Sequence, residues 1–238
     1  MRLLAVAFAA AVASLSGCRR DRPPAAPQPG VSYEAYITEA ARLDAEATRE
    51  DEAAEAAAQR GADYQCQTAP ESEQTTTGGE RLHGTRVCDD VAAADRRRHE
   101  ARAKELREAA DRARARAGTL LDADRIACQG LAFDRLRDPP LRRLAARAAV
   151  ERVDRGARIT LSGGDLDAGE LRRELACHHA RAALGGHDPD YMPSEPVTVA
   201  GASFRVEAVG PAVVVTVVAG DPTAIEVVRR RAEALVGR

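Results

Sequence analysis

The chain has 238 residues, a formal net charge of −2 and 30% charged residues, so acidic and basic side chains nearly cancel. A nucleic-acid-binding protein carries a clustered excess of basic charge, whereas here Arg is interleaved with Asp and Glu, which excludes nucleic acid as the expected partner. Aromatic residues make up 3% and Trp is absent. The core must therefore be built from Ala, Leu, Val and Ile. The length of the chain allows one large or two small domains.

Residues 1–17 have the layout of a secretory signal peptide. Arg2 is a basic start, residues 3–15 are almost entirely apolar, and two small residues precede Cys18. This order of charged start, apolar middle and small residues is typical of exported proteins. The apolar run is shorter than the ~20 residues that a membrane-spanning helix needs. An ordinary cleaved signal, the other alternative, needs no cysteine at this position.

The segment Leu15-Ser16-Gly17-Cys18 resembles the lipobox of bacterial lipoproteins. The resemblance implies cleavage before Cys18 and a thioether-linked diacylglycerol on that residue, with further acyl chains such as palmitate. It implies a membrane anchor without a spanning helix. No cofactor is expected besides the covalent lipid. Because Arg19 rather than Asp follows the cysteine, the resemblance also implies the periplasmic face of the outer membrane of a Gram-negative cell envelope.

Residues 18–31 are predicted to form a Pro-rich tether, either as an extended, semi-rigid spacer or, the favoured interpretation, as a disordered tail without specific partners. Residues 32–118 are predicted to form an antiparallel helical hairpin with a long Gly-, Thr- and Ser-containing loop over 61–88. The first helix begins at Ser32, an N-cap, with Val31 packing on Tyr36, and it stops near Gly61. Its apolar stripe is Tyr33, Tyr36, Ile37, Ala40, Leu43, Ala47, Ala54, Ala57 and Ala58.

The second helix of the hairpin is predicted over 89–117 and is dominated by charged residues. Such a run is usually a solvated face. The alternative is an arm that engages another helix, from an envelope protein or a second copy of this chain. The predicted apolar seam is narrow and consists of Val91, Ala94, Ala101, Leu106, Ala109 and Ala113.

Four cysteines follow Cys18, an even number that fits an oxidising compartment. They are Cys66, Cys88, Cys128 and Cys177. Because an antiparallel hairpin brings its two loop ends together, Cys66–Cys88 is the favoured pair, which leaves Cys128 to bond Cys177. Free thiols or a metal site are the alternatives.

Residues 119–156 are predicted to be connecting helices. Gly118 breaks the preceding pattern, and Thr119 with Asp122 restarts it in a helix that holds Cys128. Asp138 is expected to cap a further helix that starts at Pro139-Pro140 and continues to Ala148.

Residues 157–238 are predicted to be a small βαββα-type domain with its helices on one face of the sheet. The strands are 158–161, 197–206 and 212–219, and the helices open at caps Asp167 and Asp221. The 213–218 run of Val and Thr is expected to be a central strand covered on both faces. This part is similar to the C-terminal module of uncharacterised lipoproteins from GC-rich bacteria, a likeness that implies no activity. The whole chain is thus predicted to be α+β and mostly helical.

One constellation could carry chemistry: Cys177, His178, His179 and His187, with Met192 nearby. Thiolate, imidazole and thioether are ligands suited to copper or zinc. On a helix, however, Cys177 and His178 point in different directions, which favours a disulfide for Cys177 and a core position for His178. The Gly-x-Ser-x-Gly nucleophile pattern and a Gly-rich phosphate loop are absent.

The sequence therefore predicts a lipid-anchored cell-envelope protein that is not an enzyme and serves in structure or in protein contact. Its expected partners are the membrane, through the lipid, and an envelope protein at the charged helical arm. A periplasmic metal-binding lipoprotein that uses Cys177, His178, His179 and His187 is the alternative.

Overall fold

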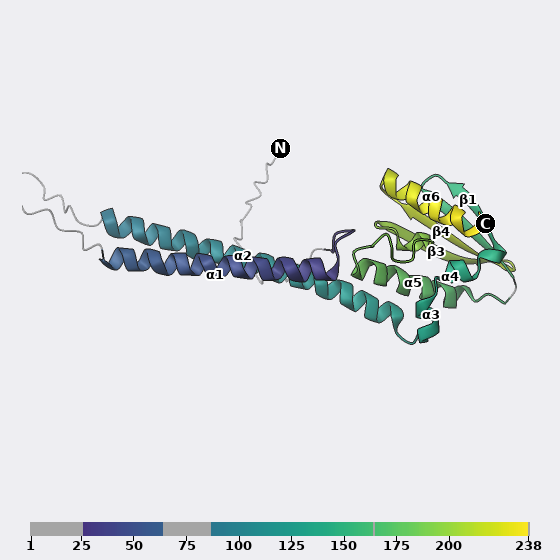
Figure 1. The fold of residues 1–238 in the computed structure, drawn as a ribbon, viewed down its shortest axis with the longest axis horizontal. Coiled ribbons are helices and arrows are strands. Elements are labelled where there is room, and N and C mark those ends of the chain that lie inside the picture. Colours follow the sequence, from purple (N-terminus) through teal and green to yellow (C-terminus); the bar gives the residue numbers. More distant parts are fainter. Residues whose placement is uncertain (1–25, 64–86, 164, 238) are drawn as a thin grey trace, which may run out of the picture.

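The computed structural model describes residues 26–63, 87–163 and 165–237. They form an α+β protein in which a long pair of antiparallel helices extends from a shorter body of sheet and helices (Figure 1). The predicted fold class is therefore confirmed. The predicted signal peptide, Cys18, Cys66 and most of the 61–88 loop lie outside the described residues. Among the described helices, none combines the length and apolarity needed to cross a membrane.

Helices α1 (Tyr33–Asp63) and α2 (Val87–Cys128) form the arm. Ser32 caps α1 as predicted, because its Oγ accepts the Ala35 N–H at 3.1 Å. The predicted break at Gly118 is wrong, since α2 continues through it for ten more residues. A glycine inside a helix costs only about 1 kcal/mol relative to Ala, and burial of Ala117 and Leu120 on either side offsets that cost.

The two helices of the arm meet along a seam made mostly of alanine. Positions alternate three and four residues apart, the heptad spacing of a coiled coil. On α2 the predicted Leu106 and Ala113 are buried, but Val91, Ala94 and Ala101 are exposed. The predicted seam had the wrong phase there, because several alanine stripes on α2 are nearly equivalent. The buried seam residues are Tyr36, Ala40, Leu43, Ala47, Ala54 and Ala57 on α1, and Ala103, Leu106, Ala110, Ala113, Ala117 and Leu120 on α2.

The segment between the arm and the sheet differs from its prediction. It contains three short helical pieces: α3 (Phe133–Arg137), α4 (Pro140–Arg143) and the 3-10 turn η1 (Ala145–Arg147). Asp138 does not cap α4, whose N-cap residue is Pro139 without a side-chain bond. The helix expected to reach Ala148 ends at Arg143, and Ala148–Val153 is a strand, β1. This strand forms because it pairs antiparallel with β2 across a tight turn, from Val153 opposite Gly156.

The sheet domain, residues 148–237, holds four antiparallel strands in the order β1-β2-β4-β3. The others are β2 (Gly156–Ser162), β3 (Ala202–Val209) and β4 (Ala212–Ala219). The strand predicted from Val197 starts later, because residues Pro196–Thr198 form a 3-10 turn, η2. Gly156 allows β2 to approach β4 closely: a Cβ there would lie 2.0 Å from the Val217 carbonyl oxygen.

Both long helices of the sheet domain join one buried cluster with a single face of the sheet. They are α5 (Ala168–Leu184) and α6 (Pro222–Val236), each capped by the predicted aspartate, Asp167 or Asp221. Burial alternates strictly along β4, which lies in the interior of the sheet. The strand is therefore central as predicted but covered on one face only, and Val214, Thr216 and Val218 on the other face are half-buried.

Candidate functional site at the junction of the arm and the sheet domain

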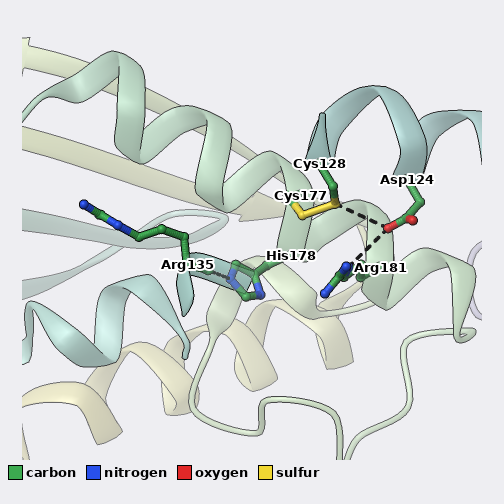
Figure 2. The surroundings of a disulfide bond; sticks show 6 residues. All are labelled: Asp124, Cys128, Arg135, Cys177, His178 and Arg181. Atoms are coloured by element: carbon green, nitrogen blue, oxygen red, sulfur yellow. Dashed lines mark hydrogen bonds and ion pairs between the residues drawn. A yellow bond between two sulfur atoms is a disulfide. The ribbon is translucent and has the colours of Figure 1, made fainter. Parts of the chain in front are cut away.

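A disulfide bond joins the last residue of α2, Cys128, to Cys177 in the middle of α5 (Figure 2). The two Cα atoms are 4.7 Å apart and the residues are 49 positions apart in the chain. Cross-linking a loop of that length lowers the conformational entropy of the unfolded chain. In the chain-entropy model this stabilises the folded protein by about 4 kcal/mol. The bond therefore fixes the arm to the sheet domain covalently. The companion pair Cys66–Cys88 cannot be described, because Cys66 and the Cys88 side chain lie outside the described part.

A charged pair flanks the disulfide. Asp124, one turn before Cys128, lies 3.6 Å from Arg181 of α5. Its Oδ1 is also 3.4 Å from the Cys128 sulfur, a close contact rather than a hydrogen bond, because a disulfide sulfur carries no proton. The Asp124–Arg181 pair thus links the same two helices as the disulfide (Figure 2).

Glu174 provides a second link at this junction. Its carboxylate is only 2% exposed and pairs with both Arg135 of α3, at 2.6 Å, and Arg143 of α4. Arg135 also reaches Glu170 at 3.2 Å. A buried carboxylate is tolerated only with such partners, so these pairs hold the connecting segment on α5. Sequence reasoning missed Glu174, although a charged residue beside Leu171 and Leu175 on an apolar helix face was a usable signal.

Glu195, just before η2, is a fully buried carboxyl group. Its Oε2 accepts the Leu141 N–H at 3.2 Å, while its Oε1 has no partner among the described residues. Burial raises the pKa of Glu195 to about 8, so this group is mostly protonated at neutral pH. The guanidinium of Arg231 lies nearby and donates to the Glu195 carbonyl oxygen and to Thr198 Oγ1. No sequence pattern marked Glu195, because it lies in an irregular segment.

His178 is completely buried, which agrees with the expected core position. Its Nε2 lies 3.1 Å from the Arg135 carbonyl oxygen, so Nε2 carries the proton. Its Nδ1 is buried without a partner in the described part of the chain. Burial lowers the pKa of His178. This imidazole is therefore a neutral packing residue whose donor nitrogen holds the end of α3.

The other two candidate histidine ligands, His179 on α5 and His187 just after it, lie together. His179 Nδ1 is 2.7 Å from the Val197 carbonyl oxygen, and His187 Nδ1 is 2.8 Å from that of Thr198. Their ring centroids are 5.8 Å apart. Since a carbonyl can only accept, both Nδ1 atoms carry protons, and both Nε2 atoms present lone pairs. Burial lowers the pKa of His187, which strengthens the neutral form.

The structure therefore brings together two of the four candidate metal ligands, His179 and His187. Cys177 is not available as a thiolate because it is in the disulfide, and His178 faces Arg135. Met192 lies in the loop after α5 with a positive φ of 48°. Within residues 26–63, 87–163 and 165–237, no three His, Cys, Asp or Glu side chains are placed to hold one metal ion.

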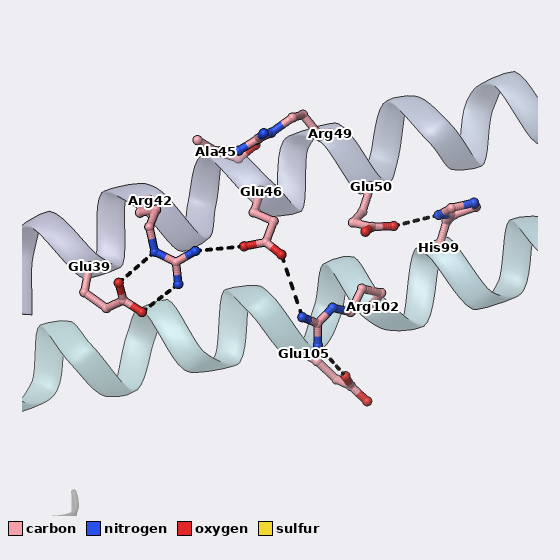
Figure 3. Close-up of polar contacts among 9 residues, drawn as sticks. All are labelled: Glu39, Arg42, Ala45, Glu46, Arg49, Glu50, His99, Arg102 and Glu105. Carbon is pink, nitrogen blue, oxygen red and sulfur yellow. Dashed lines mark hydrogen bonds and ion pairs between the residues drawn. The ribbon is translucent and has the colours of Figure 1, made fainter.

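The arm itself carries ion pairs between its helices (Figure 3). Asp44 pairs with Arg114, Asp51 with Arg107, and Glu46 lies 3.7 Å from Arg102. One pair differs from these because its members occupy seam positions. Glu50 falls in the heptad phase between Ala47 and Ala54, and its Oε2 is 2.6 Å from His99 Nδ1. A polar pair in the seam of a coiled coil fixes the axial register of the helices.

Taken together, one disulfide and the ion pairs of Asp124 and Glu174 hold the arm and the connecting segment on the sheet domain, while the arm presents a charged outer surface. Comparison of the chain with protein-family models, with curated proteins and with solved structures found no match.

Proposed function

We propose that the protein is a lipid-anchored, non-catalytic component of the cell envelope that presents a rigid helical arm to a protein partner. The observation that carries the proposal is the fixed junction, where Cys128–Cys177 and the Glu174 pairs tie the arm to the sheet domain. An arm held in one orientation would keep a bound partner at a constant distance from the anchored domain. Disulfides persist in oxidising compartments, which supports a place outside the cytosol.

The position of the first helix also supports this proposal. α1 starts at Tyr33, fifteen residues after the lipobox-like cysteine, and Gly186 at the end of α5 packs against Ser32. The base of the arm thus lies beside the sheet domain. At 1.5 Å per residue, the 31 residues of α1 extend about 45 Å from that base.

Two experiments test the proposal. Globomycin treatment should cause an unprocessed precursor to accumulate, and a Cys18→Ser chain should leave the membrane fraction. A photo-crosslinking residue at exposed arm positions Glu52 or Arg97 should give a discrete adduct in cells. The same residue at exposed sheet positions Arg158 or Arg205 is the matched control. Equal labelling from both regions, or a soluble wild-type chain, contradicts the proposal.

Metal binding is the second candidate, and the histidine pair favours it. Histidines that bind metals usually donate the other ring N–H to a carbonyl or carboxylate, as the Nδ1 atoms of His179 and His187 do here. With metal–nitrogen bonds of about 2.0 Å, two imidazoles on one ion have centroids roughly 4.5–6 Å apart. Elemental analysis of the purified protein tests this role. Stoichiometric copper or zinc that is lost in His179→Ala and retained in His99→Ala supports it, and metal-free protein contradicts it.

A further inference from the structure

A groove lies between α1 and α2 near the base of the arm, with a volume of about 380 Å³. Its floor is apolar and includes the buried side chains of Tyr36, Leu43 and Ala113. Two guanidinium groups, Arg112 and Arg116, line it one helical turn apart. Sites for small molecules typically have volumes of about 300–1,000 Å³, mostly apolar walls and a few placed polar groups. This groove has a volume in that range and a few placed polar groups, and its walls are about half apolar.

The two arginines of the groove differ from most other arginines of the arm because they form no ion pair with a described carboxylate. Seven other arginines on the arm pair with carboxylates within it: Arg42, Arg96, Arg98, Arg102, Arg107, Arg114 and Arg125. Arg112 and Arg116 have no such partner among the described residues. The groove therefore carries positive charge that the described part of the arm does not neutralise.

Arg116 lies against the Tyr36 ring, and its Nε–H group donates no hydrogen bond to a described residue. Its guanidinium carbon lies 6.0 Å from the centroid of the Tyr36 ring. The Tyr36 hydroxyl accepts the Gln28 N–H at 2.6 Å, which fixes the ring. The Arg116 Nε is buried and lacks a hydrogen-bond partner in the described part of the chain. A buried donor without an acceptor is unfavourable, so an incoming acceptor would relieve this cost.

One carboxylate, Glu39, also lines the groove. Both of its oxygens accept from Arg42, each at 2.8 Å, and these hydrogen bonds lower the pKa of Glu39. Because Arg42 already holds both oxygens, Glu39 does not occupy the place of an anion opposite Arg112 and Arg116.

We propose that this groove binds an amphipathic anion. A phosphate or carboxylate group would accept from Arg112 and Arg116, whose planar, forked donors match such oxygens. A small apolar group on the same ligand would lie against Tyr36, Leu43 and Ala113. A ligand of this kind is either a phospholipid, through its phosphate headgroup, or a soluble organic anion. The inference does not depend on the lipid anchor.

Titration of the purified Cys18→Ser chain with phenyl phosphate, followed by calorimetry, tests the groove. Saturable one-to-one binding is expected, tighter than that of inorganic phosphate. Arg112→Gln with Arg116→Gln should weaken it about tenfold or more, since charge-assisted hydrogen bonds are lost. Arg96→Gln with Arg98→Gln removes the same charge from the same helix and should change affinity by less than about twofold. No saturable binding, or equal loss in both double variants, overturns the proposal.

Two further arms complete the test. If the first double variant unfolds, Arg116→Lys keeps the charge but removes the Nε donor, and it should still weaken binding; unchanged affinity overturns the proposal. Co-sedimentation with phosphatidylglycerol vesicles, compared with phosphatidylcholine vesicles, identifies the source. Capture by phosphatidylglycerol that Arg112→Gln with Arg116→Gln abolishes indicates a lipid headgroup. Phenyl phosphate binding without vesicle capture indicates a soluble anion.

Discussion

The arm and the sheet domain are stabilised in different ways. The arm buries a narrow seam of alanines, each with little apolar surface, under a layer of exposed ion pairs. The sheet domain buries Ile, Leu and Val between one sheet face and two helices. Since burial contributes about 25 cal/mol per Å² of apolar surface, the domain should unfold cooperatively, and the arm should open locally from the end away from the sheet domain. The junction matters because it connects a weakly packed element to a strongly packed one.

The largest loss of stability is expected when an isoleucine of the sheet domain is replaced by alanine, compared with the same substitution in the arm. Ile159→Ala on β2 empties a fully buried position and should lower the free energy of unfolding by about 3–4 kcal/mol. Ile37→Ala on the arm removes a side chain that is 37% exposed and should cost less than about 1 kcal/mol. Urea denaturation followed by circular dichroism measures both. Similar losses at the two positions would contradict the contrast between the regions.

Removal of the disulfide should come next. Cys128→Ser combined with Cys177→Ser should cost about 2–4 kcal/mol and should lower amide protection at the end of α2 more than in β4. Hydrogen exchange measured by mass spectrometry separates the two segments. Unchanged protection near residue 128 would show that the ion pairs alone hold the arm to the domain.

Glu195 should make the stability of the sheet domain, but not that of the arm, depend on pH. Its pKa is about 8 in the folded protein and near 4.5 when unfolded. The folded state therefore holds a proton that the unfolded state has lost, and this group's contribution to stability falls as pH rises from about 4.5 to about 8. Glu195→Gln keeps the acceptor for the Leu141 N–H and should stabilise the protein by about 2 kcal/mol at pH 8, less than the full shift because the new amide N–H also lacks an acceptor.

Thermal unfolding of Glu195→Gln and wild type, compared at pH 5 and pH 8, measures this effect. Because the cost of the unpaired amide N–H applies at every pH, Glu195→Gln should be less stable than wild type at pH 5, by about 1–2 kcal/mol, and more stable at pH 8. A constant difference between the two pH values would mean that Glu195 is ionised in the folded protein.

The smallest effect is expected in the arm, at Glu50 and His99. These side chains are 27% and 30% exposed, so a double-mutant cycle with alanine should give a coupling of about 0.5–1 kcal/mol that decreases in high salt. The Asp51–Arg107 pair, which is outside the seam, is the control and should couple more weakly. A larger coupling for the control pair would show that the seam position of Glu50 is unimportant.

Local signals predicted much of the fold from sequence. Caps at Ser32, Asp167 and Asp221 act within a few residues, so the helices that they open begin where predicted. The strand β1 was missed because its sequence, which starts with two alanines, resembles a helix, and only long-range pairing with β2 makes it a strand. The phase of the α2 seam likewise depends on the partner helix.

The junction could be predicted only in part. The even number of cysteines and the hairpin together pointed to Cys128–Cys177, because pairing follows from topology. The buried state of Glu174 and Glu195 depends on tertiary contacts with Arg135, Arg143 and Leu141, which are 31 to 54 residues away. Residue patterns within one helix or loop cannot report such distances, so these groups became visible only in the folded chain.

Mass spectrometry of the protein isolated from its native cells tests the central claim most directly, because one digest reports the anchor and the junction. We expect the first peptide to begin at Cys18 with the mass of attached acyl chains, and a linked peptide pair to contain Cys128 and Cys177. An unmodified chain beginning at Met1, with both of these cysteines as free thiols, would contradict the account.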